Sequence, residues 1–200
     1  MTAQPHSGGR ASAPIRTEAL EALLTEKGLV NAGALDGLIN RFVNDVGPMN
    51  GAQVVARAWV DADFRERLLD DGTAAVGEFG FSGPQGEHIV VVPNDDKQHN
   101  VVVCTLCSCY PWPLLGLPPD WYKDPAYRSR IVREPRLVLS EMGLDLEDDI
   151  NITVWDSSAE NRYFILPQRP KGTDDLSEEQ LAALVSREAM VGVAVVEVAA

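Results

Sequence analysis

The sequence predicts an α+β fold, with a helical N-terminal arm followed by a globular domain of layered helices and sheet. Helical and strand-like segments are mixed without the regular strand–helix–strand order of an α/β protein. The 200 residues are 45% hydrophobic and 24% charged, which is typical of a globular chain that can bury a sizeable core. All three cysteines lie in the stretch VVVCTLCSCYPW, residues 101–112, so one loop of this fold is expected to carry its chemistry.

The N-terminal part divides into a tail and an arm. Residues 1–14 are rich in Gly, Ser, Pro and Ala, which predicts a flexible tail. A first helix is indicated by leucines at helical spacing, and a second by an apolar stripe that ends at Gly47-Pro48. The leucines are Leu20, Leu23 and Leu24, and the stripe is Leu35, Leu38, Ile39, Phe42, Val43 and Val46. We interpret residues 15–47 as an arm that packs on a partner subunit and 48–200 as the main domain.

The main domain is expected to begin with helices and to alternate afterwards. Helices are predicted at 52–59, 63–70, 73–79, 127–134 and 137–142, and strands at 88–93, 98–103, 150–156 and 162–166. The last two strands are expected to pair with each other, and the proline-rich 111–119 to have no regular structure. Ser177 and Gln180 form a capping-box pattern that opens a final helix through about Glu188.

Charge and hydropathy exclude several classes of function. A formal net charge of −13 argues against binding nucleic acid or an anionic membrane, since both require a basic face. The longest uncharged run, 98–119, contains polar residues and several prolines, so it does not predict a membrane-spanning helix. The first residues contain no apolar segment of the kind found in secretory signals, and we expect a cytoplasmic protein.

Three cysteines in a reducing compartment indicate metal binding or catalysis before disulfides. Cys104 and Cys107 form a CxxC pair, which fits a redox pair or half of a zinc site, with His99 as a fourth ligand. Unligated thiols and a less common metal site are also compatible with this spacing.

Cys107 and Cys109 are two residues apart, and this spacing favours the less common metal site. The amide nitrogens of Ser108 and Cys109 lie between the two sulfurs, so a metal that binds both sulfurs draws these amides towards it. Two sulfurs and two nitrogens can form a plane, with Cys104 in an axial position. This arrangement suits a metal of square-planar or octahedral preference better than tetrahedral zinc.

The segment VCTLCSCYPW resembles the metal claw of the nitrile hydratase alpha subunit, with its six-residue core CTLCSC intact. Four further segments resemble that subunit in the same order, so the resemblance covers residues 17–193. They are GPQGE at 83–87, LGLPPDWYKDPAYRSRIVREPR at 115–136, VWDSSAENRYFILPQRPKGT at 154–173, and the capped last helix with VGV at 191–193.

The resemblance implies a metal centre that adds water to nitriles and yields amides. The implied ligands are the sulfurs of Cys104, Cys107 and Cys109, with the backbone amides of Ser108 and Cys109. Family members oxidise the second cysteine to sulfinic acid and the third to sulfenic acid, which corresponds to Cys107 and Cys109 here. Thr105 corresponds to the cobalt-type motif, so non-corrin Co(III) is expected rather than Fe(III). A trivalent metal is a Lewis acid that polarises a nitrile or activates water, and Cys109 is expected to act beside it.

A second chain is expected to complete the site. Residues 98–119 contain no Lys or Arg, although the claw sulfurs are negatively charged and buried anions need donors or cations. Either distant arginines of this chain reach the claw or another polypeptide supplies them. The resemblance implies a nitrile hydratase beta subunit, an alpha2beta2 assembly and a cobalt-insertion activator protein. The chain alone is therefore expected to be inactive.

Three residues outside the claw are candidates for the catalytic site. By resemblance, Gln85 contributes to its surroundings, although a polar residue in a loop needs no such role. Trp112 is expected to line an apolar nitrile pocket, or else to belong to the core. Arg162 is the in-chain cation expected to reach the site, against the alternative of an exposed strand arginine. His88 and His99, on predicted strands, are interpreted as structural histidines.

Two other functions are compatible with the sequence. The gamma subunit of thiocyanate hydrolase shares the claw and much of the fold, and the SEMG stretch at 140–143 resembles it. Tyr110 and the WDSS stretch favour nitrile hydratase. A zinc-binding interaction subunit without catalysis is the alternative from another class, and the metal content of the protein distinguishes it.

Overall fold

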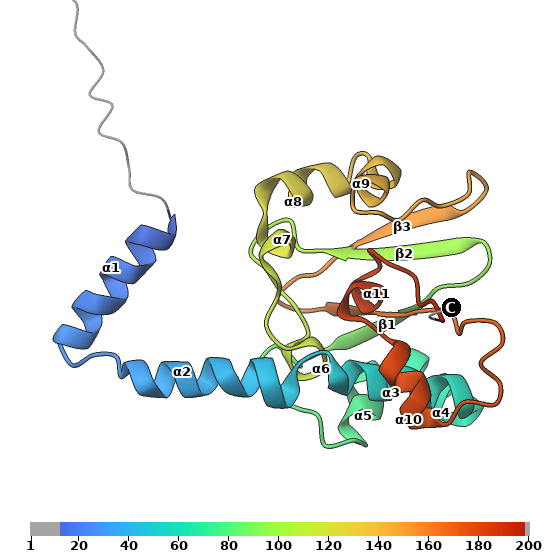
Figure 1. Ribbon diagram of the computed structural model, residues 1–200, viewed down its shortest axis with the longest axis horizontal. Helices are drawn as coiled ribbons and strands as arrows, with labels where there is room; N and C mark the ends of the chain where they lie inside the picture. Colours follow the sequence, from blue (N-terminus) through green and yellow to red (C-terminus); the bar gives the residue numbers. More distant parts are fainter. Residues whose placement is uncertain (1–12, 199–200) are drawn as a thin grey trace, which may run out of the picture. The chain divides into compact units, whose positions relative to one another are not determined.

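The computed structural model describes residues 13–198, except for the side chains of Ala13 and Asn44. Figure 1 shows its helices and strands along the chain. The helices are α1 (Ala13–Glu26), α2 (Ala32–Asn40), the π-helical η1 (Arg41–Val46), α3 (Met49–Val60), α4 (Ala62–Asp70), α5 (Gly72–Gly77), α6 (Trp112–Leu115), α7 (Asp120–Lys123), α8 (Pro125–Ile131), α9 (Pro135–Glu141), α10 (Glu178–Leu184) and α11 (Arg187–Val191). The strands are β1 (Ile89–Pro93), β2 (Gln98–Val103), β3 (Asn151–Asp156) and β4 (Arg162–Leu166). The mixture confirms the predicted α+β class.

The chain divides into a segment that ends at Arg41 and a compact unit that begins at Phe42. In the first segment α1 and α2 form where leucine spacing predicts helices, and the Asn31 side chain caps α2 by accepting from the Ala34 N–H at 3.0 Å. None of the residues of α2 is buried. Most of the predicted tail, residues 1–12, lies outside the described residues, and α1 already includes Ala13 and Pro14.

Short polar caps start the helices of the compact unit. Asp61, Asp71 and Asp124 each accept a hydrogen bond from a backbone N–H in the first turn of α4, α5 and α8 respectively. The predicted capping box of Ser177 and Gln180 is present at the start of α10. The helix that follows is shorter than predicted, because Val185 adopts an extended conformation and Ser186 caps a separate helix, α11.

The strands form two parallel pairs, β1 with β4 and β2 with β3 (Figure 1). The prediction that the last two strands pair with each other was therefore wrong. Strands β3 and β4 follow each other in sequence, but each pairs with an earlier, strongly apolar strand. The pairing is parallel, which requires a long crossover connection between the two strands of a pair. The helices α6–α9 lie in the crossover from β2 to β3. The structure also corrects the expectation for 111–119, since Trp112–Leu115 form the single-turn helix α6.

The core lies between these strands and the helices that cover them. Helices α4 and α5 pack against β1, α11 packs against β4, and α9 packs against β3. Strand β2 is almost fully buried and ends in Val101, Val102 and Val103, whose exposure does not exceed 2%. Among the described residues, no helix combines the length and the apolar character needed to cross a bilayer.

Candidate metal centre

The cysteine loop starts directly after the buried strand β2. The register sets Val103, the last residue of β2, beside Asp156, the last residue of β3. The short connection 157–161 then leads into β4, whose first residue, Arg162, lies beside Ile89 at the start of β1. The claw, the end of β3 and the starts of β1 and β4 are therefore brought to one end of the strands.

The three sulfurs converge. The Sγ atoms of Cys104 and Cys107 are 3.5 Å apart and those of Cys107 and Cys109 are 3.2 Å apart, and all three lie within 4.8 Å of one another. Cys104 and Cys109 are buried, with 0% and 6% exposure, whereas Cys107 is exposed. One metal ion can bind all three sulfurs at such separations.

Backbone amides of the loop face the same sulfurs. The N–H groups of Cys107 and Ser108 donate to the Cys104 Sγ at 3.3 and 3.2 Å. Ser108 has φ 143°, a conformation that L-amino acids with a side chain rarely adopt. Strain of this kind persists where the surroundings require it and is common at functional sites. The Ser108 backbone thereby bends the loop around the three sulfur atoms.

The electrostatics of the cluster favour a bound cation. Hydrogen bonds from the thiols of Cys109 and Cys104 lower the pKa of Cys107, and the backbone N–H groups of Ser108 and Cys109 act in the same direction. Burial raises the pKa of Cys109 to about 12, with further contributions from Cys107 and Cys104. Of Cys107 and Cys109, Cys107 therefore holds a negative charge more readily. Soft thiolate sulfurs select transition metals, and such a metal would replace the remaining thiol protons.

Two side chains from other elements hold the ends of the loop. The Asp156 carboxylate accepts hydrogen bonds from the backbone N–H of Thr105 at 2.9 Å and from its hydroxyl at 2.5 Å. The Tyr122 hydroxyl, fully buried, donates to the Cys109 carbonyl at 2.9 Å. These contacts tie one end of the loop to β3 and the other to α7.

Arg128, a residue that the sequence did not single out, contacts the middle of the loop. Its Nη2 donates to the Cys107 carbonyl at 2.9 Å. A hollow of about 350 Å³ lies beside this contact, lined by Thr105, Pro125, Arg128, Ser129 and Val132. Arg128 lies far from the claw in sequence, and no motif spacing joins it to the cysteines. The one available signal was its place in the segment PAYRSR, within the stretch 115–136 that resembles the family, and a sequence segment by itself does not show which atoms its side chains contact.

Gln85 and Arg162 contact each other. The Arg162 Nη2 donates to the Gln85 Oε1 at 3.1 Å, its Nη1 bonds the Ala159 carbonyl, and Glu87 lies 3.7 Å away as an ion-pair partner. Arg162 is 5% exposed, so it is a buried cation and not the exposed strand arginine of the alternative reading. Its described hydrogen bonds go to these groups and not to the cysteines.

The loop that holds Gln85 packs on the segment after the claw. Gln85 has φ 64°, and a Cβ added to Gly86 would lie 2.7 Å from the Pro113 Cγ, so the backbone approaches Pro113 closely. Trp112, next to Pro113, stacks edge-on against Phe42 with ring centroids 5.3 Å apart. Its buried indole N–H finds no hydrogen-bond partner among the described residues.

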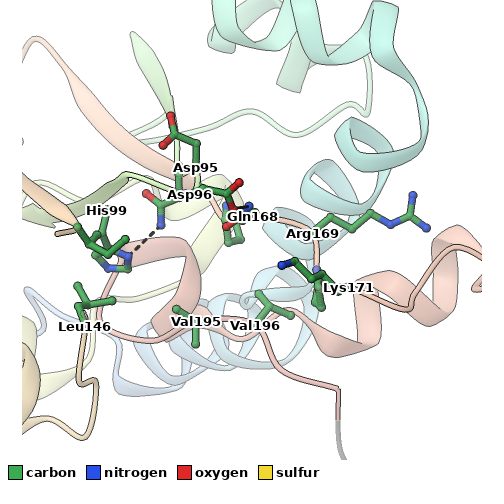
Figure 2. A pocket seen from close by; sticks show the side chains of 13 residues that line it. Asp95, Asp96, His99, Leu146, Gln168, Arg169, Lys171, Val195 and Val196 are labelled. Atoms are coloured by element: carbon green, nitrogen blue, oxygen red, sulfur yellow. Dashed lines mark hydrogen bonds between the residues drawn. The ribbon is translucent and has the colours of Figure 1, made fainter. Parts of the chain in front are cut away.

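A different cavity, of about 320 Å³, lies at the other end of β2 (Figure 2). His99 lies there, buried, with Nε2 2.8 Å from the Gly192 carbonyl and Nδ1 3.4 Å from the Asn94 amide. Asp96 and Gln168 at the rim bond each other at 2.6 Å. Burial lowers the pKa of His99, and the bond to Gly192 opposes this in part. Both ring nitrogens are occupied far from the sulfurs, so His99 is structural and does not contribute a fourth ligand.

The chain is similar to known proteins in sequence and in fold. Residues 11–194 match the family model of the nitrile hydratase alpha chain. The chain is 57% identical over 180 residues to the low-molecular-weight cobalt-containing nitrile hydratase subunit alpha of Rhodococcus rhodochrous, covering 90% of this chain and 87% of that protein. It is 40% identical to thiocyanate hydrolase subunit gamma of Thiobacillus thioparus, over 88% of this chain and 77% of the relative.

A solved structure extends the likeness from sequence to fold. A double mutant of the Fe-type nitrile hydratase from Comamonas testosteroni Ni1 superposes with a TM-score of 0.84 at 45% identity, covering 92% of this chain and 89% of that one. Relatives thus include proteins named for cobalt and for iron. The family model matches nearly the whole of the chain, which therefore belongs to the nitrile hydratase alpha-chain family.

Proposed function

We propose that this chain is the alpha subunit of a cobalt nitrile hydratase, which adds one water molecule to a nitrile and yields the amide. The convergence of three cysteine sulfurs within 4.8 Å, with peptide N–H groups directed at them, is the observation that carries the proposal. The relative from R. rhodochrous is named for the same metal and activity.

The proposed ligands are the sulfurs of Cys104, Cys107 and Cys109 and the amide nitrogens of Ser108 and Cys109. The fit is supported by the N–H groups of Ser108 and Cys109, which both act on the Cys107 thiol, and by the strained Ser108 backbone that turns them inwards. When bound, Co(III) would supply the Lewis acidity that polarises a nitrile or a water molecule. Thr105, in the first gap of the motif, supports cobalt over Fe(III).

Cys107 is proposed to carry a sulfinic acid and Cys109 a sulfenic acid. The exposure and the lowered pKa of Cys107 support its advanced oxidation, since oxidation follows thiolate character and access. Cys109 is buried and has a raised pKa, which fits a less oxidised sulfur. Its oxygen would be positioned beside the reacting carbon as nucleophile or base.

A beta subunit is proposed to be an obligate partner, in an alpha2beta2 assembly that a cobalt-insertion activator protein loads in the cytoplasm. Leu106, in the middle of the claw, is 88% exposed and would be covered by a partner that docks at this loop. The arm, proposed at 15–47, also exposes apolar side chains that a partner would cover. They include Ile15, Leu20, Leu23, Leu29, Leu38, Ile39 and Val43.

Gln85, Trp112 and Arg162 are proposed to shape the substrate site. The unpartnered indole N–H of Trp112 and the unpartnered Nε–H of Arg162 support this, because buried donors are rarely left without an acceptor. The Gln85 amide orients the Arg162 guanidinium through their hydrogen bond. These residues would exclude bulk water and hold a small substrate at the end of the strands.

Thiocyanate hydrolysis is the second candidate, favoured by the relative from T. thioparus. Both candidates require the same centre and differ in substrate. The test is co-expression of the full chain with its partner subunit in cobalt medium, followed by parallel assays on a nitrile and on thiocyanate. Amide production at a higher rate than carbonyl sulfide release is expected. The reverse order would support the second candidate, and a zinc-loaded complex without either activity would reject both.

A further inference from the structure

Arg128 is held next to the claw by its own helix. Its neighbour on α8, Tyr127, is buried and donates its hydroxyl hydrogen to the Val102 carbonyl of β2 at 2.8 Å. The Tyr127 ring also packs edge-on against Trp121, with centroids 5.1 Å apart. The start of α8 is therefore fixed to the strand that leads into the claw, and Arg128 is directed at the loop that follows.

The nearby arginines of this region have other partners. Arg130 forms ion pairs with Glu134 and Glu141, and Arg133 donates to the Ser129 carbonyl. Arg128 has no carboxylate partner among the described residues, and its half-buried guanidinium donates to the claw backbone instead. Its Nε–H is buried and finds no acceptor there either. The charge of Arg128 thus remains uncompensated within this part of the chain, beside a loop that collects negative charge.

The contacted carbonyl belongs to the peptide that joins Cys107 to Ser108. A trans peptide is planar, with its C=O and N–H pointing in opposite directions. Arg128 holds the carbonyl oxygen on the outer side, and the N–H of the same peptide, that of Ser108, points inwards to the Cys104 sulfur at 3.2 Å. One side chain therefore fixes the orientation of an amide nitrogen that is a proposed metal ligand.

From this geometry we propose that Arg128 is a positioning residue of the metal centre, an inference that rests on the proposed function. Peptide resonance shares electron density between nitrogen and oxygen, so density that a metal-bound nitrogen gains is also found on the carbonyl oxygen. A cationic donor on that oxygen stabilises it, because hydrogen bonds to charged groups are about twice as strong as neutral ones. Arg128 thereby supplies part of the positive charge that residues 98–119 lack.

The test uses the full chain, co-expressed with its partner subunit in cobalt medium, in four forms: wild type, Arg128→Met, Arg128→Lys and the control Arg133→Met. The first measurement is the rate at which cobalt is lost to a chelator. We expect Arg128→Met to lose cobalt about tenfold faster than wild type, since outer partners of metal ligands change affinity about 10–100-fold. Arg128→Lys should lie between the two because it retains the charge, and Arg133→Met should match wild type.

The second measurement is the sulfur-to-cobalt charge-transfer absorption of the same samples. Without the Arg128 cation, the Ser108 peptide nitrogen would donate more electron density to cobalt. The absorption band of Arg128→Met should therefore move to higher energy. A purely structural role of Arg128 does not predict this shift. If Arg128→Met fails to assemble, the Lys variant decides through the same two measurements. Cobalt loss and band energy equal to wild type in the Arg128 variants would overturn the inference alone. A wild-type complex that takes up no cobalt would overturn the proposed function and this inference together.

Discussion

The two ends of strand β2 differ in how completely their polar groups are hydrogen-bonded. At its start, His99 uses both ring nitrogens, and the neighbouring Asn100 side chain donates to the carbonyl of Pro93 at 2.7 Å and accepts from Trp155 at 2.9 Å. At its end, the claw holds three convergent sulfurs and a strained Ser108. Among the described residues, the buried side-chain donors without a partner are those of Tyr110, Trp112, Arg128, Arg162 and Arg187, of which Tyr110 and Trp112 follow the claw directly.

This difference separates structure from function. Buried polar groups that hydrogen-bond one another stabilise a unique fold. The His99 end is also closely packed, because a Cβ added to Gly192 would lie 2.0 Å from the Asn100 carbonyl oxygen. Strain, clustered sulfurs and unpartnered donors are retained where a further component completes the site. The claw end is therefore the place where a metal and a partner are expected to act, while the His99 end maintains the fold.

The largest effect is expected from removing a claw sulfur. In Cys104→Ser the buried sulfur that two amides contact is lost, so cobalt content should fall to background and nitrile hydration by about a thousandfold or more. Elemental analysis and a rate assay of the co-expressed complex provide the measurement. The unfolding midpoint of the metal-free chain should change little. Full cobalt content in this variant would show that the metal binds elsewhere.

A smaller effect, on stability alone, is expected at the other end of β2. His99→Gln removes the imidazole between Asn94 and Gly192 and should lower the free energy of unfolding by about 1–3 kcal/mol, the cost of disturbing a buried hydrogen bond. Urea unfolding of the metal-free chain measures it. The cobalt content per folded complex should equal that of wild type, and a loss of cobalt would contradict the separation of the two ends.

The same variant tests the pH dependence of stability. Burial lowers the pKa of His99 in the folded state, whereas the unfolded chain keeps the ordinary value of 6.5. Below pH 6.5 the unfolded state therefore binds more protons than the folded state. The stability that neutral, buried His99 contributes is fully present above pH 6.5 and is lost as pH falls below this value. Urea midpoints between pH 7.5 and 5.5 should fall more steeply for wild type than for His99→Gln. Parallel curves would rule out this role of His99.

The smallest expected effect compares Asp156, the last residue of β3, with Asp149, which lies just before the strand. Asp156→Ala removes both hydrogen bonds to Thr105 and should accelerate cobalt loss about threefold to tenfold, below most of the roughly 10–100-fold range for direct partners of metal ligands, because Thr105 is not itself a proposed ligand. Asp149, before β3, pairs with Lys97 in an exposed ion pair, and Asp149→Ala is the control that should leave cobalt retention unchanged. Chelator competition measures both variants. Equal rates would mean that the loop holds its shape without Asp156.

The sequence predicted what local patterns determine. Apolar periodicity located α2 and the four strands, the Ser177 side chain located α10, and the spacing of Cys104, Cys107 and Cys109 predicted that their sulfurs meet. Contacts between distant segments depend on tertiary packing and were missed. The parallel pairings of β3 and β4 are of this kind, and so are the contacts of Arg128 with Cys107 and of Asp156 with Thr105. Gln85 and Arg162 were selected separately, and the structure joins them.

The errors have local causes. Prolines at 111, 113, 118 and 119 predicted irregular structure, yet Pro111 precedes the first turn of α6 and Pro113 lies within that turn, where a missing N–H costs little. The sequence predicted one final helix that continues past Val185, because the residues on both sides favour helix. In the structure the Ser186 side chain instead caps a separate helix, α11. Such competition between a cap and a continuing helix is resolved by packing, here of α11 against β4.

The metal content of the purified complex tests the central claim most directly. Three thiolate sulfurs with inward-facing amides should retain about one cobalt per alpha chain after co-expression with the partner subunit in medium that contains both cobalt and zinc. Mass spectrometry of the peptide that holds Cys107 and Cys109 should show three added oxygens in the same sample, two for a sulfinic and one for a sulfenic acid. Stoichiometric zinc with unoxidised cysteines would contradict the account.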